Sequence, residues 1–228
     1  YELRGLCTGR VPKVDKTEIE RVSAVKEQLG LTITSLSTGL FKIEAADPQV
    51  QPRIAEDLPR ACDMARGLGT DVLVDFGFRK PGVKRGTHGD VPGTQCPQQV
   101  IDLVGRIADR IAEFGCRFFL ENESICWADT GEATARIVRA AARPNLFVNW
   151  DPTNASHFGE TVFPDGYGFV RSMVAHVHVK DFDPAAGHAV VPPGQGGVNW
   201  PDQIRALIAD GYKGYLVVET HMRPRVES

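Results

Sequence analysis

Four residues with metal-binding side chains recur along the second half of the chain, at intervals of about one strand and one helix. They are Glu121, Asp151, His178 and Glu219, and they stand 30, 27 and 41 residues apart. Three carboxylates and one imidazole form a hard, oxygen-rich donor set, which suits Mn²⁺, Mg²⁺ or Co²⁺ and can also hold Zn²⁺. Because carboxylates at close range repel one another unless a cation offsets them, these residues predict a site for one divalent metal ion.

An ion held in this way can chelate a hydroxyl and its neighbouring carbonyl and polarise the C–H bond between them. Glu121 and Glu219 come from strands three apart, which lie on nearly opposite sides of an eight-stranded ring, so one can remove a proton and the other return it. This predicts an isomerase or epimerase that acts on a sugar, ketopolyol or sugar phosphate through a metal-bound enediolate. Two alternatives stay open: a dehydratase (lyase) of an inosose- or dehydroshikimate-like substrate, and a non-catalytic barrel that binds a sugar or a metal.

The segment that carries His178, the one nitrogen ligand among the four, has the clearest strand pattern. Residues 174–179 alternate valines with other residues, which is typical of a β-strand. His176, His178 and Lys180 then share one face, and Val177 and Val179 lie on the other. Three polar groups on one face are costly to bury unless a metal, a substrate or water satisfies them.

Each candidate ligand stands at or near the end of a segment with strand character. Seven such segments alternate with helical ones, and repeated strand–helix units predict a parallel sheet. We expect an α/β fold: a (β/α)8 TIM barrel forming a single domain over residues 1–228, and lacking the first βα unit and the last helix. A doubly wound open sheet is the alternative. The expected strands are 1–4, 31–36, 72–76, 118–120, 146–148, 174–179 and 215–218, and the expected helices are 17–29, 54–68, 100–114, 132–142, 167–173 and 201–209.

One of the long connections, 77–97, carries several basic residues. It follows an expected strand and precedes an expected helix, so it belongs on the face of the sheet that carries the site. Long loops at this face often close over a substrate, and a solvated insertion is the equally weighted alternative. Its basic residues and histidine are Arg79, Lys80, Lys84, Arg85 and His88.

The composition excludes several kinds of partner. The 228 residues are 42% hydrophobic, with a net charge of -3, which does not favour nucleic acid or a membrane surface. No apolar run approaches the roughly 20 residues of a membrane span. Five cysteines without a CxxC pair indicate reduced thiols and a cytoplasmic protein. A barrel that lacks a strand exposes two sheet edges, so a homo-oligomer is a further expectation.

Several motifs resemble the xylose isomerase-like TIM-barrel superfamily, which includes sugar phosphate isomerases and epimerases and the family 2 AP endonucleases. The motifs are Leu-Glu-Asn at 120–122, Asp-Pro-Thr-Asn at 151–154, His-Val-His-Val-Lys-Asp at 176–181, Pro-Pro-Gly-Gln-Gly at 192–196 and Val-Glu-Thr-His at 218–221. The resemblance implies the same four metal ligands and a proton-transfer role for Glu121 and Glu219. It also implies substrate contacts, from Asn154, His176, Lys180, Glu2 and Lys42.

Three of these residues could instead have structural roles without touching a substrate. His176 could only support His178 by hydrogen bonding inside the barrel. Glu2 could be an ion-pair partner of Arg4 or Lys42, and Lys180 could pair with a neighbouring acid.

Departures from the family pattern bear on the substrate. Glu123 stands where many members have His, and Asn154 stands where ketose 3-epimerases tend to have His. Gln195 replaces a usual Glu, and the arginine that those epimerases place after the metal-binding histidine has no counterpart between 181 and 187. These differences argue against a ketose 3-epimerase. The six histidines are not placed to form the three-zinc site of the apurinic endonucleases, so DNA is not the expected substrate.

Overall fold

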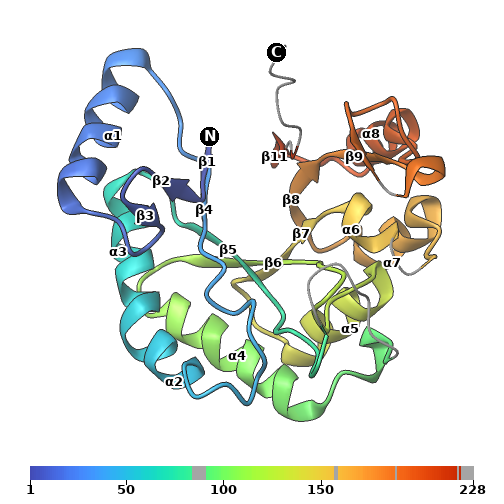
Figure 1. Cartoon of the computed structure of the whole chain (residues 1–228), viewed down its shortest axis with the longest axis horizontal. Coiled ribbons are helices and arrows are strands. Elements are labelled where there is room, and N and C mark those ends of the chain that lie inside the picture. Colours follow the sequence, from blue (N-terminus) through green and yellow to red (C-terminus); the bar gives the residue numbers. More distant parts are fainter. Residues whose placement is uncertain (84–90, 157–158, 188, 220, 222–228) are drawn as a thin grey trace.

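The computed structural model describes residues 1–83, 91–156, 159–187, 189–219 and 221. Its main feature is one parallel seven-stranded sheet that curves into a nearly closed barrel, with helices on the outside (Figure 1). The strands follow the spatial order β1 (Glu2–Leu3), β4 (Ser35–Ser37), β5 (Val72–Phe76), β6 (Arg117–Glu121), β7 (Leu146–Trp150), β8 (Val174–Val179) and β11 (Tyr215–Val218). The prediction of a TIM-barrel fold is confirmed, and the open sheet is not.

The described residues form the six expected helices, with shifted ends, and two short helices that were not expected, of three and five residues. They are α1 (Lys16–Leu29), α2 (Val50–Pro52), α3 (Leu58–Gly67), α4 (Gln98–Ala112), α5 (Gly131–Ala141), α6 (Pro152–Ser156), α7 (Tyr167–Val170) and α8 (Trp200–Ala209). Short π- and 3₁₀-helical segments lie at Arg53–Asp57, Gly93–Gln95, Val162–Gly166 and Pro184–Ala186. Two small hairpins pair β2 (Gly5–Leu6) with β3 (Gly9–Arg10), and β9 (Asp181–Asp183) with β10 (Ala189–Val191).

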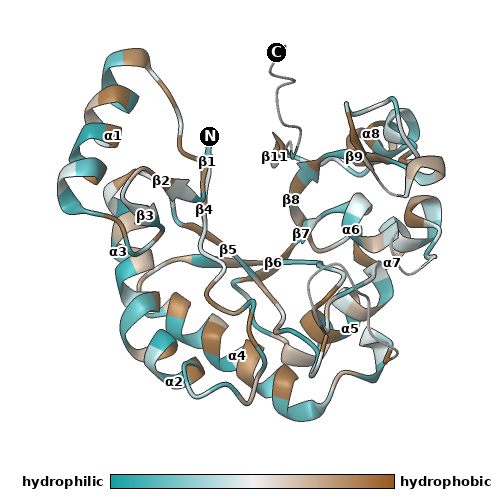
Figure 2. Ribbon diagram, in the orientation of Figure 1, coloured by the Kyte–Doolittle hydropathy of each residue, from teal (hydrophilic) through white to brown (hydrophobic). Residues whose placement is uncertain are grey.

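Helix α4 shows why the helices lie where they do. Val100, Val104, Ile107 and Ile111 repeat at helical spacing and are buried against the sheet. In Figure 2, hydrophobic and hydrophilic residues alternate along α4, as expected of a helix with one buried side. Gly115 follows with a positive φ of 68°, a backbone conformation that favours glycine, and the chain turns there into β6.

The region around Pro59 agrees in part with the prediction. The sequence predicted a late helix start or a kink at this proline, and α3 begins at Leu58, but other helical structure already begins at Val50 and continues through the π-helical segment Arg53–Asp57. Pro59 lies in the first turn of α3, where a missing backbone N–H costs little.

The sheet has one opening. β1 and β11 are the two ends of the strand order, do not pair with each other, and face each other across the opening in Figure 1. Val218 of β11, next to the opening, is 64% exposed. None of the residues of α1 is buried, although Ile19 and Val22 pack in part against the core.

The long connection after β5 is anchored at its beginning. Lys80 is buried, and its ammonium lies 2.8 Å from Asp129. Lys84, Arg85 and His88 lie outside the described residues. Within the described part of the chain, no helix combines the length and the apolar character needed to cross a bilayer.

Candidate metal centre

The structure brings the four predicted ligands together. One donor atom each from Glu121, Asp151, His178 and Glu219 lies within 4.8 Å of the other three. Glu121 ends β6, Asp151 follows β7, His178 lies near the end of β8, and Glu219 follows β11. Because neighbouring strands are parallel, their carboxyl ends meet at one edge of the barrel.

Asp151 is held in place by two asparagines. Its backbone N–H donates to Asn122 Oδ1 at 2.8 Å, and Asn122 Nδ2 donates back to the Asp151 carbonyl at 2.7 Å. One carboxylate oxygen, Oδ1, accepts the backbone N–H of Asn154 at 3.0 Å where α6 begins. The other oxygen, Oδ2, is buried and faces the ammonium of Lys180, so a metal ion at this oxygen would share it with a positive charge that is already there.

Lys180 places a positive charge in the cluster. Its Nζ lies 2.6 Å from Asp151 Oδ2 and 2.9 Å from Glu219 Oε2. Burial raises the pKa of Asp151 to about 6, with Lys180 opposing the shift. Burial also acts to raise the pKa of Glu219, but Lys180 and His178 outweigh it and lower this pKa to about 2. Two neighbouring carboxyls therefore differ strongly in how readily they take up a proton.

His178 lies between acidic groups on both sides of its ring. Nδ1 is 3.4 Å from Glu121 Oε1 and 3.6 Å from Glu219 Oε2, and Nε2 is 3.0 Å from Glu2 Oε1. Burial acts to lower the pKa of His178, but Glu121 and Glu2 outweigh it and raise this pKa well above 6.5.

The donor set fits a divalent cation. It offers three carboxylates and one imidazole nitrogen, and the side chains of Glu121, Asp151 and His178 are at most 4% exposed. Such hard donors suit Mg²⁺, Mn²⁺ or Co²⁺ and can also hold Zn²⁺. Without an ion, Lys180 and His178 offset the negative charge of the carboxylates. A bound cation would offset the same charge.

A cavity of about 280 Å³ is lined by two of the four ligands. Arg4, Lys42, Asn154 and Lys180 line it, together with Glu121 and Glu219. A larger, mainly apolar cavity of about 610 Å³ lies between β1 and α1, but none of the four ligands lines it. We therefore identify the smaller cavity as the one where a substrate could meet the site.

The predicted substrate contacts fall into two groups. Asn154, Lys42 and Lys180 line the cavity, and Lys42 also forms an ion pair with Glu123. Glu2 and His176 are not among the residues that line it. Instead, Glu2 contacts both histidines of β8, and neither Arg4 nor Lys42 forms an ion pair with it among the described residues.

The sequence reasoning missed Arg4 as a residue of the site. Arg4 lines the cavity, and its guanidinium forms an ion pair with Glu219 at 2.5 Å across the opening between β1 and β11. The sequence did contain an indication of this position. Arg4 follows Glu2 by two positions in an expected strand, so the two side chains share one face of it.

Comparisons with known proteins agree with this fold. A family described as xylose isomerase-like TIM barrel matches residues 2–228. The probable 3-DHS dehydratase AsbF from Bacillus anthracis has 18% identity and a TM-score of 0.72, and the match covers 92% of this chain and 77% of that one. The 3-keto-D-glucoside 4-epimerase YcjR from E. coli has 19% identity and a TM-score of 0.68, with 92% and 79% covered.

A third solved structure is a xylose isomerase-like TIM barrel protein from Mycobacterium smegmatis in complex with magnesium. It has 22% identity and a TM-score of 0.70, and the match covers 93% of this chain and 74% of that one. At these identities the solved structures establish the fold and not the reaction. Together with the match over almost the whole length, they show that the chain belongs to the xylose isomerase-like TIM barrel family.

Proposed function

We propose that the protein is a divalent-metal-dependent isomerase or epimerase that acts on a sugar, ketopolyol or sugar phosphate. The observation that carries the proposal is the convergence of Glu121, Asp151, His178 and Glu219 beside a cavity of about 280 Å³. Hydroxylated carbonyl compounds suit such a site, because an ion there, once bound, would stabilise negative charge on neighbouring substrate oxygens.

The chain's own residues would move the proton. Glu219 lines the cavity and, as a carboxylate, can accept a proton from a substrate carbon. Glu121 comes from β6 and Glu219 follows β11, so the two carboxylates reach the cavity from different sides and one can return a proton that the other removed. Asn154, whose Nδ2 lies 3.4 Å from Glu121 Oε1, and the cations Arg4 and Lys180 would orient the substrate's oxygens.

A dehydratase (lyase) of an inosose- or dehydroshikimate-like compound is the second candidate. Lys42 favours this candidate, because its ammonium group lines the same cavity and can donate a proton to a leaving hydroxyl. After Glu219 has removed a proton next to a carbonyl, a β-hydroxyl can leave as water if an acid protonates it. The likeness to a dehydratase supports this candidate at the level of the fold alone.

Metal content is the first test. We expect about one Mn²⁺, Mg²⁺, Co²⁺ or Zn²⁺ per chain after loading and dialysis, and loss of this ion in His178→Ala. His221→Ala is the matched control, because His221 lines the same cavity without belonging to the four ligands. A wild-type chain that takes up no metal under metal-replete conditions would contradict both candidates.

The second test identifies the reaction. Metal-loaded protein would be incubated in D₂O with ketoses, inososes and dehydroshikimate, and the products followed by NMR and mass spectrometry. Deuterium at the substrate carbon without loss of water supports the isomerase or epimerase. An enone that has lost water supports the dehydratase. Metal binding without turnover of any of these compounds would favour the non-catalytic barrel.

We also propose a cytoplasmic setting and no nucleic-acid partner. All five cysteines are free thiols, and four of them are buried. The net charge of -3 gives no general attraction to a phosphate backbone.

A further inference from the structure

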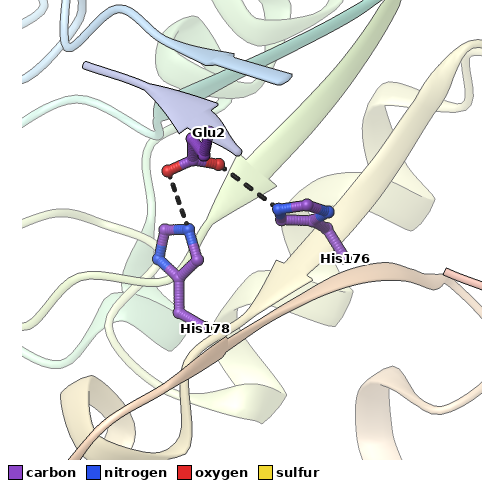
Figure 3. A group of neighbouring side chains, drawn as sticks. All are labelled: Glu2, His176 and His178. Atoms are coloured by element: carbon purple, nitrogen blue, oxygen red, sulfur yellow. Dashed lines mark hydrogen bonds and ion pairs between the residues drawn. The ribbon is translucent and has the colours of Figure 1, made fainter. Parts of the chain in front are cut away.

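A buried carboxylate lies beside the histidine ligand on the side away from the other ligands. Glu2 comes from β1, and its side chain is only 7% exposed. Figure 3 shows its two carboxylate oxygens directed at two rings of β8. Oε1 lies 3.0 Å from His178 Nε2, and Oε2 lies 3.3 Å from His176 Nε2.

The ring of His178 connects this carboxylate to the ligand cluster. Nε2 faces Glu2, while Nδ1 faces Glu121 and Glu219 at 3.4 and 3.6 Å. A neutral imidazole carries one proton, and a carboxylate can only accept. Glu2 is the nearest of the three carboxylates that face the ring, at 3.0 Å, so its contact favours the tautomer with the proton on Nε2. The lone pair is then on Nδ1, the nitrogen that faces Glu121 and Glu219.

We infer, on the basis of the metal site of the proposed function, that Glu2 is a positioning residue. Its carboxylate holds the Nε2 proton of His178, so that Nδ1 binds the metal. Carboxylates that orient a metal-binding histidine in this way commonly change metal affinity by about 10- to 100-fold when they are removed. This role takes the place of the substrate contact expected from the sequence.

The neighbours of Glu2 keep it in this orientation. Ser35, the register partner of Glu2 on β4, donates its hydroxyl to Oε2 at 2.7 Å. His176, which lies next to the same oxygen, restricts the carboxylate from the β8 side. Asn149 Nδ2 lies 3.1 Å from Nε2 and 3.3 Å from Nδ1 of His178, so this amide covers the ring and does not select one nitrogen.

The test compares metal affinity in Glu2→Ala, Glu2→Gln and wild type by titration with Co²⁺ and Mn²⁺. We expect Glu2→Ala to raise the dissociation constant about 10- to 100-fold. Glu2→Gln should have an intermediate effect, because its amide oxygen can still accept from Nε2 without the charge. Ser35→Ala is the matched control: it removes a hydrogen bond to the same carboxylate but no contact to His178, and should leave the affinity within about 3-fold of wild type.

A second readout separates positioning from a general structural role. Long-range ¹H–¹⁵N spectra of histidine-labelled, Zn²⁺-loaded wild type should show His178 with its proton on Nε2, assigned by loss of the signals in His178→Asn. This measurement holds even if Glu2→Ala does not fold. A proton on Nδ1, or unchanged metal affinity in a folded Glu2→Gln and Glu2→Ala, would overturn the inference alone. A wild type that binds no metal would overturn the proposed function as well.

Discussion

At the scale of single residues, Lys180 has the most informative position. Its ammonium lies between Asp151 and Glu219, two of the carboxylates that we expect to hold the metal. Its backbone carbonyl accepts hydrogen bonds from Thr153 and Trp200, which fix the end of β8. In the absence of an ion, Lys180 therefore offsets the negative charge of the site from a rigid position.

Replacing this charge tests that role. In Lys180→Met, two buried carboxylates lose their cation, and we expect the metal-free protein to lose about 3–5 kcal/mol of unfolding free energy. Added Mn²⁺ should recover most of the loss, because it supplies positive charge at the same carboxylates. Urea denaturation with EDTA and with Mn²⁺ measures both effects.

The control for this prediction is an exposed lysine. Lys16→Met changes a side chain that is 92% exposed, and should alter the unfolding free energy by no more than about 0.5 kcal/mol. A Lys180→Met protein as stable as wild type in EDTA would show that the carboxylates do not depend on this ammonium.

At the scale of elements, one acidic residue ties two helices together. Asp210, which follows α8, accepts hydrogen bonds from Arg171 Nε at 3.1 Å and from the Tyr167 hydroxyl of α7 at 2.8 Å. The bonds from Arg171 and Tyr167 lower the pKa of Asp210 below its ordinary value of 3.8. A lowered carboxyl pKa means that the ionised form stabilises the fold, so the contribution is present above pH 3.8 and is lost as the pH falls below it.

Asp210→Asn should therefore lower the melting temperature by about 1–3 °C at pH 7, a modest effect because the pair is near the surface. The difference between variant and wild type should shrink as the pH falls below 3.8, because Asp210 then begins to take up a proton and its ionised form contributes less. Scanning calorimetry from pH 2 to pH 7 checks the sign. A difference that grew on acidification would contradict the assignment.

The sequence predicted features that depend on residues close together in the chain, and it did not predict contacts between residues far apart in the chain. The ligands Glu121, Asp151, His178 and Glu219 follow from strand alternation and the strand–helix period, both local properties. The partners of Glu2 do not, because its contact with His178 spans 176 positions and depends on how far the sheet curls. The late start of the helix at Pro59 was predicted, but the π-helical segment Arg53–Asp57 before it was not, because no propensity rule signals such a segment.

At the scale of the whole molecule, the opening between β1 and β11 is the main departure from a closed ring. Its sides carry unpaired strand edges and exposed apolar residues, among them Leu216 and Val218 of β11. Unpaired edges with exposed apolar side chains favour pairing with another chain. The Arg4–Glu219 ion pair crosses the opening only at the end near the site.

We expect the 228-residue chain to self-associate through this opening, in line with the homo-oligomer expected from the sequence. Val218→Lys should weaken association by placing a charge on the exposed edge, which sedimentation velocity over a range of concentrations would measure. Val91→Lys is the control, because Val91 is similarly exposed, at 45%, in the connection before α4. Equal association in the two variants would exclude β11 as the contact.

The contact between Glu2 and His178 also makes completion of the site depend on folding of both ends of the chain. It joins the first strand to the last but one, so the site cannot be whole until nearly the entire chain has folded. An ion bound at His178 would therefore hold the amino-terminal edge as well as its own ligands. Removing the ion should speed amide hydrogen exchange in β4, where Ser35 and Leu36 face β1, while amides buried between α4 and the sheet keep their protection.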